Sequence, residues 1–342
     1  MIKIALDAMG GDNAPHDVVH GGIEAARSAK DKYTVVLVGE KSIVEKEIAR
    51  HFHTQNLPIE IVHAPDVVAM DDQPSMALRK KESSIAVGIK LLKEGAVDAF
   101  VSAGNTGAVM ASALFGLKRI PGIRRPAIGS ILPSEKGPTL VMDVGANVDC
   151  RPLDLLQFGV MGEIYYTHIF SPPETTVGLL SVGHEKSKGN EAVIKAHELF
   201  ANSTLNFIGN VEGGDILHGT AHVVVCDGFV GNIILKVAES LHGLFKFNLK
   251  RLIRKYFFSQ IGAILMKPTF EGIRQIFDYQ EYGGAPLLGV DGCCIIAHGK
   301  STPHAIKNAI LAANKMVVGN INYHIKEKMA SLSVNEPSAE LS

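Results

Sequence analysis

The sequence predicts an α/β fold in which a mainly parallel sheet is covered by helices on both faces. Three observations support this prediction. Short β-branched runs alternate with longer helical patterns along the chain. Strands such as Val223–Cys226 are apolar at every position, which is typical of strands buried on both faces. The 342 residues are 46% apolar and contain no long linker rich in Pro, Gly or Ser, so we expect one compact body.

The β-branched runs predict ten strands, which are Ile2–Leu6, Thr34–Val38, Ile59–Val62, Ala96–Val101, Ala127–Leu132, Thr139–Met142, Val177–Val182, Leu205–Ile208, Val223–Cys226 and Cys293–Ala297. The longer patterns predict eight helices, which are Asp17–Ala29, Ser42–His53, Ser83–Lys93, Thr106–Leu117, Pro152–Tyr166, Glu191–Phe200, Phe229–Tyr256 and Pro303–His324. We therefore expect a single α/β domain over 1–328, with a helical hairpin at about 241–278. The small polar residues of 329–342 predict a disordered tail.

Composition argues against several classes of protein. The formal net charge is −1 and only 20% of the residues are charged, which does not suit broad nucleic-acid binding. No apolar run reaches the ~18 residues of a transmembrane helix, and the start of the chain lacks the pattern of a signal peptide. The four cysteines form no C-x-x-C pair, as expected for small buried side chains in a reducing compartment. We expect a cytoplasmic protein.

Loops rich in Gly, Asn and Asp follow most of the predicted strands. In a parallel sheet such loops lie at the carboxyl ends of the strands, where α/β proteins bind their ligands. Glycine lets backbone N–H groups approach an anion, and a helix N-terminus adds partial positive charge. Seven such loops on one sheet edge predict a shared polar crevice for a small oxyanion: Asp7–Asp12, Ser102–Gly107, Asp143–Asn147, Gly183–Asn190, Gly209–Gly214, Asp227–Asn232 and His298–Ser301.

Several familiar motifs are incomplete. Gly299–Ser301 imitates the end of a P-loop, but Cys294 stands where its first glycine belongs. Ser102–Gly107 lacks the first glycine of a dinucleotide fingerprint. No G-x-S-x-G elbow or H-E-x-x-H motif is present, so we expect no serine nucleophile, no metal and no cofactor. His222 and Asp227 match an H-x4-D signature, but a strand between them would hold them roughly 16 Å apart, so we interpret the match as chance.

The sequences of these loops, and their order along the chain, resemble those of the bacterial phosphate acyltransferase family. The resemblance runs through nearly the whole chain, from Asp7–Asp12 to Tyr282–Gly289 and His298–Gly299. It implies a Rossmann-like α/β/α sandwich, similar to phosphotransacetylases and isocitrate-type dehydrogenases. It also implies a homodimer that moves a fatty acyl group from acyl carrier protein to inorganic phosphate. The product, an acyl phosphate for phospholipid synthesis, would pass to a membrane glycerol-3-phosphate acyltransferase.

One loop departs from the pattern that this resemblance leads us to expect. The strand before Gly183 ends in Ser181, where we expect Asn. His184 and Ser187 also lie in this loop, which ends at Lys188-Gly189. The fine structure of the loop is therefore the part of the chain that the resemblance describes least well.

The implied reaction needs no covalent enzyme intermediate, because phosphate is already a nucleophilic anion and a thiolate is a good leaving group. It needs a cradle for phosphate, alignment against the thioester, and donors for the developing oxyanion. The candidate phosphate-binding residues are Gly10, Gly11, Asp12, Ser102, Gly104, Asn105, Thr106 and Gly107. The candidate catalytic residues are Lys188, Asp227, Asn232, Asp143, Asn147 and His298. The alternatives for these residues are a surface lysine, an Asx-turn, helix caps and a structural histidine.

Two basic segments are candidate contact surfaces. Arg79-Lys80-Lys81 either binds the acidic carrier protein or is a solvated charge run. The segment 241–269 has no acidic residue, and its apolar residues recur at helical spacing. It predicts a basic amphipathic hairpin that rests on anionic lipid, through Lys250, Arg251, Arg254, Phe257 and Ile261. A helix packed on the body, a dimer interface and a carrier-protein surface are the alternatives.

Other functions stay open. One is an enzyme similar to phosphotransacetylase that uses acyl-CoA as donor. Another is a nucleotide-dependent oxidoreductase, which the missing fingerprints disfavour. A third is a non-catalytic membrane scaffold for lipid enzymes. Our main hypothesis is that the protein is an acyltransferase of the cytoplasm that associates peripherally with the inner face of the membrane.

Overall fold

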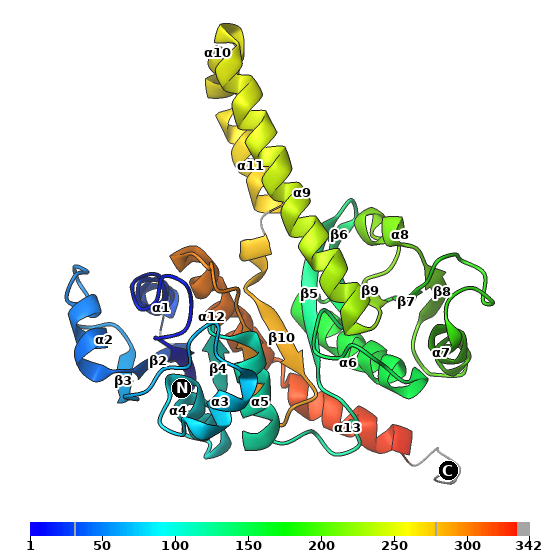
Figure 1. Ribbon diagram of the computed structural model, residues 1–342, viewed down its shortest axis with the longest axis horizontal. Coiled ribbons are helices and arrows are strands. Elements are labelled where there is room, and N and C mark those ends of the chain that lie inside the picture. Colours follow the sequence, from blue (N-terminus) through cyan, green and yellow to red (C-terminus); the bar gives the residue numbers. More distant parts are fainter. Residues whose placement is uncertain (31, 278, 334–342) are drawn as a thin grey trace.

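The computed structural model contains one 11-stranded sheet that runs through two lobes of the molecule (Figure 1). It describes residues 1–30, 32–277 and 279–333. The strand order is β3-β2-β1-β4-β11-β10-β5-β6-β9-β7-β8. The strands are β1 (Ile2–Asp7), β2 (Tyr33–Gly39), β3 (Ile59–His63), β4 (Ala99–Ser102), β5 (Ala127–Ser134), β6 (Gly137–Met142), β7 (Val177–Leu180), β8 (Phe207–Val211), β9 (Val223–Val225), β10 (Ala285–Leu288) and β11 (Cys293–Ile296).

Most neighbouring strands are parallel, which confirms the predicted α/β class. The antiparallel pairs are β10 with β11, β10 with β5, and β5 with β6. These pairs divide the sheet into two groups of opposite direction. Strands β1 to β5 and β11 run one way, whereas β6 to β10 run the other. The prediction that seven loops share one sheet edge is therefore wrong, because the loops after β1, β4 and β11 leave in the opposite direction from those after β6, β7, β8 and β9.

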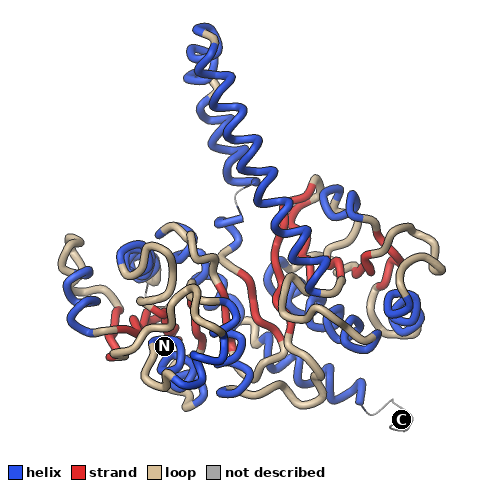
Figure 2. Tube along the Cα trace, viewed as in Figure 1, coloured by secondary structure: helices blue, strands red, loops and turns tan. Residues whose placement is uncertain are grey.

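Helices cover both faces of the sheet (Figure 2). They are α1 (His16–Ser28), α2 (Lys41–Ile48), α3 (Pro74–Arg79), α4 (Ser84–Lys93), α5 (Thr106–Gly116), α6 (Pro152–Phe170), α7 (Glu191–Ala201), α8 (Gly213–His218), α9 (Gly228–Lys255), α10 (Phe257–Leu265), α11 (Lys267–Phe277), α12 (Pro303–Val318) and α13 (Ile321–Ser333). Val223 and Val225 of β9 belong to the core that includes residues of α1, α6 and α12, and Val224 belongs to the core under α4, α5 and α8. Alternate residues of a strand point to opposite faces, which explains why β9 is apolar at each position.

Several boundaries differ from expectation. Strand β10 and the short helices α3 and α8 were not predicted. The single helix expected over Pro303–His324 is two helices, because the chain turns at Gly319 and Asn320, and Asn320 adopts φ +47°. The expected tail begins too early, since α13 continues to Ser333. The remainder of that tail, 334–342, lies outside the described residues.

Helices α9, α10 and α11 form an arm that projects from the body (Figure 1). Helix α9 starts in the body, α10 lies at the tip and α11 returns beside α9, so the expected hairpin is present up to Phe277. The break at the tip is at Tyr256, which has an extended backbone. Gly262 lies inside α10, and Pro268 is in the first turn of α11, where proline is tolerated. Within the described part of the chain, no helix combines the length and apolar character needed to cross a bilayer.

Candidate active site

The loops that follow β1, β4 and β11 pack against one another, because these strands are neighbours. Asp7 is fully buried and accepts a hydrogen bond of 2.7 Å from the Ser102 hydroxyl, which in turn accepts one of 3.0 Å from the Gly104 N–H. Burial raises the pKa of the Asp7 carboxyl. A side chain at Gly10 would overlap Asp7 and Gly104, so this glycine allows the close approach of two loops. Ser102 therefore organises the loop, and its buried hydroxyl is not presented as a phosphate ligand.

Asn105 fixes the start of α5. Its side-chain oxygen accepts a hydrogen bond of 3.0 Å from Ala108 N, which makes it the N-cap of the helix. Its amide nitrogen donates to the carbonyl oxygens of Met70 and Asp72 at 3.0 and 2.8 Å. The side chain of Asn105 thus has a structural role, and its expected contact with phosphate stays a prediction. Thr106 is exposed at the first turn of α5, where backbone N–H groups and the helix dipole favour an anion.

The loop after β6 is organised by Asp143. This fully buried carboxylate accepts hydrogen bonds from the backbone N–H groups of Ile128 at 3.0 Å and Asn147 at 2.7 Å, and also from those of Gly145 and Ala146. The side-chain amide of Asn147 donates to Asp143 and to the Pro126 carbonyl. Burial raises the pKa of the Asp143 carboxyl, against the effect of these donors. Asp143 and Asn147 were expected to be catalytic, but their polar atoms are engaged within this loop.

The start of α9 lies directly against the Asp143 loop. Asp227 is the N-cap of α9 and accepts a hydrogen bond of 2.8 Å from Val230 N, and Gly228 N donates to the Asn147 carbonyl at 2.7 Å. A side chain at Gly231 would overlap the Asp143 carbonyl, so only glycine allows this contact. The N-cap alternative for Asp227 is therefore observed. One turn into the helix, the exposed Asn232 is held beside Gly145.

A cleft of about 300 Å³ opens between the first turns of α9 and strands β5, β10 and β11. Three of the expected residues line it together, namely Thr106, Asn232 and His298. They come from the segments that follow β4, β9 and β11, although β4 and β9 point in opposite directions. A sheet twist of roughly 20° per strand accumulates to about 100° over the five steps from β4 to β9, which brings these loops toward one another. The walls include Ile128, Ile131, Val144, Leu235 and Ile296.

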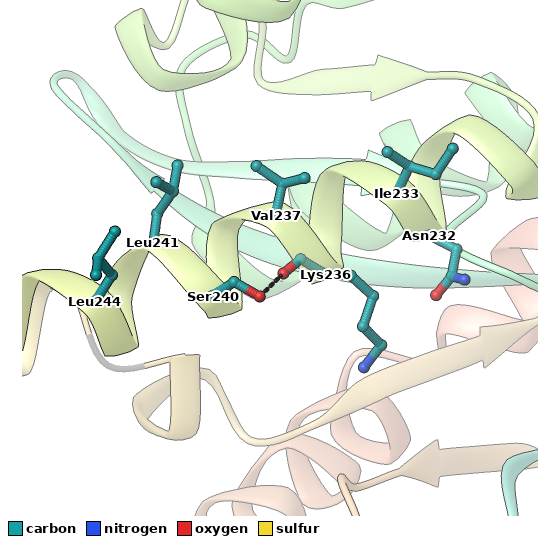
Figure 3. A pocket seen from close by; sticks show the side chains of 7 residues that line it. All are labelled: Asn232, Ile233, Lys236, Val237, Ser240, Leu241 and Leu244. Atoms are coloured by element: carbon teal, nitrogen blue, oxygen red, sulfur yellow. Dashed lines mark hydrogen bonds between the residues drawn. The ribbon is translucent and has the colours of Figure 1, made fainter.

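The cleft contains two functional groups that the sequence analysis missed. Lys236 lies one helical turn after Asn232, and its ammonium is 2.9 Å from the Glu239 carboxylate. Figure 3 shows Asn232 and Lys236 projecting from the same side of α9, whereas Ile233 and Val237 point away from them. Tyr282 also lines the cleft. The spacing of four residues between Asn232 and Lys236 is the signal that would have identified the lysine.

The ring of His298 has a defined tautomer when neutral. The backbone N–H of Lys300 donates to Nδ1 of His298 at 3.0 Å. Because Nδ1 accepts this bond, the proton of the neutral imidazole lies on Nε2, which makes Nε2 a donor. A donor at the edge of the cleft suits an oxyanion or a leaving group better than proton abstraction. Nearby, Gly11 adopts φ +126° and Asp12 N donates to the Gly299 carbonyl at 2.8 Å, so the Gly11-Asp12 turn supports the histidine loop.

Lys188 is exposed in the loop between β7 and α7 and is not among the residues that line the cleft. Strand β7 is the neighbour of β9, so this loop leaves the sheet beside the start of α9. The loop turns at Lys188, whose N–H donates to the Glu185 carbonyl at 2.9 Å, and at Gly189, which adopts φ +109°. Asn190 then caps α7. Lys188 therefore follows a strand that is parallel to and beside the strand before α9, the helix that carries Asn232.

The remaining candidates have clear positions. Gly107 is covered by Pro74, the first residue of α3. Lys80 donates to the Val67 carbonyl and pairs with Asp72 at 2.8 Å, so it holds its own segment together, while Arg79 and Lys81 are exposed. The residues expected to contact carrier protein or membrane, Lys250, Arg251, Arg254, Phe257 and Ile261, are all exposed on the arm.

The cysteines are poorly suited to nucleophilic catalysis. Burial raises the pKa of Cys150 and of Cys293 to about 12, and raises that of Cys226 and Cys294 strongly. A thiol with such a pKa is almost entirely protonated at neutral pH, and only the thiolate attacks a thioester effectively. Within the described residues there is no group of three or more His, Cys, Asp and Glu side chains arranged to hold a metal ion.

Known proteins are similar to this chain over nearly its whole length. A family model described as "Fatty acid synthesis protein" matches residues 2–324. The chain is 47% identical to a phosphate acyltransferase of Pelotomaculum thermopropionicum, over 99% of this chain and 98% of the relative. It is 48% identical to that of Dictyoglomus turgidum, over 97% and 99% respectively.

Solved structures support the fold. A phosphotransacetylase from Staphylococcus aureus matches with a TM-score of 0.62 and 16% identity, over 92% of this chain and 94% of that one. A phosphotransacetylase from Streptococcus pyogenes matches equally well, with a TM-score of 0.62 and 18% identity over 93% and 94%. At this identity the likeness concerns the fold, and it confirms the expected Rossmann-like architecture. The family model and the relatives settle the family: the chain belongs to the phosphate acyltransferases, which are acyltransferases of fatty acid and phospholipid synthesis.

Proposed function

We propose that the chain transfers a fatty acyl group from acyl carrier protein to inorganic phosphate, and releases an acyl phosphate for phospholipid synthesis. The observation that carries this proposal is the cleft at the start of α9. It combines apolar walls with a few convergent donors, Asn232, Lys236 and the His298 imidazole. Such a site can hold the apolar end of an acyl group near an anion without offering a nucleophile of its own.

The reaction proceeds by direct displacement. A phosphate oxygen attacks the carbonyl carbon of the thioester, a C–O bond forms, and the carbonyl oxygen acquires negative charge. The C–S bond then breaks and the carrier leaves as a thiolate, which takes a proton from solvent. The enzyme supplies alignment and positioned donors, which together account for large rate enhancements.

The phosphate is held by Lys188, Asn232 and the N-terminus of α5 at Thr106. Lys188 is in the loop after β7, and Asn232 is in the first turns of the helix after the neighbouring β9, so one anion between them would meet an ammonium and an amide donor. Lys236 balances the remaining charge from the next turn of α9. Because Nδ1 of His298 accepts from Lys300 N, the oxyanion would be met by its Nε2 N–H.

A second set of residues keeps these groups in place. Asp143 and Asn147 hold the loop against which α9 begins, and Asp227 caps that helix. Ser102 and Asn105 hold the loop before α5. These are positioning residues, because the polar atoms of each form hydrogen bonds to neighbouring backbone or side chains of the protein.

Arg79 and Lys81 are proposed to receive the acidic carrier protein. Both are exposed at the end of α3, and α3 lies beside α5. Lys80 is not part of this contact, because its ammonium is engaged by Asp72. The acyl phosphate then passes to a membrane glycerol-3-phosphate acyltransferase. The acceptor is embedded in lipid, so delivery favours an enzyme that works at the cytoplasmic surface of the membrane.

The arm is proposed to hold a homodimer of the chain at that surface. Its exposed apolar side chains include Phe257, Phe258 and Ile264, and α10 has no buried residue. Lys250 and Arg254 add positive charge. Residues 241–255 of α9 contain no Asp or Glu to oppose this charge. A basic surface with exposed aromatic residues is typical of peripheral binding to anionic lipid.

The arm is tested by co-sedimentation with liposomes that contain varied amounts of anionic lipid. Binding should require anionic lipid, weaken at high salt, and be lost in the Phe257→Glu/Ile261→Glu double variant. Phe115→Glu is the matched control, because Phe115 is 67% exposed on the body and Phe257 is 70% exposed on the arm. Wild-type binding by the double variant, or loss of its dimer, would exclude a lipid-binding arm.

The function itself is tested with purified chain, acyl-acyl carrier protein and ³²P-labelled phosphate. Labelled acyl phosphate should accumulate with release of one carrier thiol per acyl group. Thiol release without labelled acyl phosphate would indicate a thioesterase, and no reaction would favour a non-catalytic role.

A further inference from the structure

The loop that carries Lys188 is attached to α8 by a histidine. His184 Nε2 lies 2.9 Å from Asp215 Oδ2, and His184 Nδ1 lies 3.3 Å from Glu212 Oε1. Glu212 is the N-cap of α8 and Asp215 is in its first turn. The imidazole is therefore placed between two carboxylates of another element, with both ring nitrogens engaged.

Asp215 is a fixed partner for this histidine. Its carboxylate accepts hydrogen bonds from Glu212 N at 2.8 Å and from the Thr220 hydroxyl at 2.9 Å. The bond from Glu212 N, together with those from Thr220 and His184, holds the pKa of the Asp215 carboxyl below its usual range. Asp215 is thus ionised at neutral pH, and its position does not depend on the histidine.

The same loop places Lys188. The Glu185 carbonyl accepts one hydrogen bond from Lys188 N and one from the Asn210 side chain, both of 2.9 Å. Gly183 faces the stem of Lys188, since a side chain there would lie 3.1 Å from Lys188 Cγ. His184 lies between Gly183 and Glu185 in the sequence. Its contacts with the two carboxylates of α8 therefore fix the turn that positions the Lys188 side chain.

We infer that His184 is a positioning residue for Lys188, and that its protonation sets how firmly the loop is held. This inference rests on the proposed role of Lys188. A neutral imidazole has one N–H and can donate to only one carboxylate, whereas the imidazolium donates to both. The charged groups that face the ring are Glu212 and Asp215, and its own loop adds Glu185, Lys186 and Lys188.

The test is the steady-state kinetics of the full chain with acyl-acyl carrier protein as donor and phosphate as varied substrate, at about pH 6 and pH 8, across the range in which histidine titrates. His184→Ala should raise KM for phosphate about two- to fivefold at the lower pH, the scale of an exposed ion pair, with a smaller change in kcat. At the higher pH the difference from wild type should shrink. His184→Gln keeps a neutral donor, so at pH 6 its KM for phosphate should lie between the values of wild type and His184→Ala. Expressing each variant relative to wild type at the same pH removes the effect of phosphate ionisation.

His218→Ala is the matched control. His218 and His184 are both 62% exposed, both pair with glutamate and both involve α8, but His218 pairs with Glu135, outside the Lys188 loop. The control should leave KM unchanged at both pH values. Wild-type kinetics in His184→Ala at both pH values, or a loss of equal size at both, would overturn the inference.

Lys188→Ala separates this inference from the proposed function. If that variant loses activity while the His184 variants behave like wild type, the inference alone fails. If Lys188→Ala retains wild-type activity, the proposed role of the lysine fails first, and with it the reason for a positioning residue.

Discussion

Replacing Asp143 by alanine should destabilise the protein rather than remove a catalytic group. The carboxylate accepts backbone hydrogen bonds from Ile128 and Asn147, which are both buried, and from two more accessible amides. A buried N–H without a partner costs about 1–3 kcal/mol, so losing this acceptor costs about 2–6 kcal/mol. The unfolding entropy of 342 residues is about 0.7 kcal/mol/K, which converts the loss to a fall in Tm of about 3–8 °C.

The assay is thermal unfolding of Asp143→Ala and Asp143→Asn, with turnover measured well below both melting temperatures. Asn retains one acceptor oxygen, so Asp143→Asn should fall between alanine and wild type. Burial raises the pKa of Asp143, so the stability that wild type gains from this group is present at low pH and declines as pH rises through the folded pKa. The deficit of Asp143→Asn should therefore be greater near pH 4 than at pH 7.

The opposite pattern would refute this reasoning. An unchanged Tm in Asp143→Ala together with a loss of turnover of about 100-fold or more would identify the carboxylate as a catalytic group. Asp143 would then be a catalytic residue, as its place in a Gly-rich loop first indicated.

Further predictions concern the chemistry. Lys188→Ala and Asn232→Ala should each lower turnover at least ~100-fold and leave Tm nearly unchanged, as measured by thiol release and thermal unfolding; wild-type turnover in both would remove them from the site. A variant without cysteines should remain active if it folds, and mass spectrometry of the enzyme during turnover should find no acyl adduct; a trapped acyl-enzyme would contradict direct displacement. Lys236→Met should raise KM for phosphate several-fold, because the cleft loses a cation, and an unchanged KM would place the ammonium outside the anion site.

Most of the strands could be predicted because most are short β-branched runs with buried residues. The directions of the strands were harder to predict, because direction depends on pairing between segments that are distant in the sequence. One signal was available: only a short turn separates Ala127–Leu132 from Thr139–Met142. Parallel neighbours need a crossover of a dozen residues or more, so this gap already required an antiparallel pair and a reversal of the sheet. Strand β10 was missed because Pro286 and flanking glycines resemble a loop.

The candidate site was predicted in part. Residue type and loop position selected Thr106, Asn232 and His298, which the structure brings together in one cleft. The same criteria also selected Ser102 and Asp143, because a side chain that binds a ligand and one that binds its own loop have the same sequence pattern. Only the three-dimensional hydrogen-bond partners separate the two roles.

The central claim is that phosphate is the acyl acceptor and that acyl carrier protein is the donor. The most direct measurement compares kcat/KM for phosphate-dependent thiol release from acyl-acyl carrier protein and from the matching acyl-CoA, with purified chain and no lipid. We predict turnover that requires phosphate and is faster with the carrier protein, with acyl phosphate as the product. Release that does not depend on phosphate, or a preference for acyl-CoA, would contradict the account.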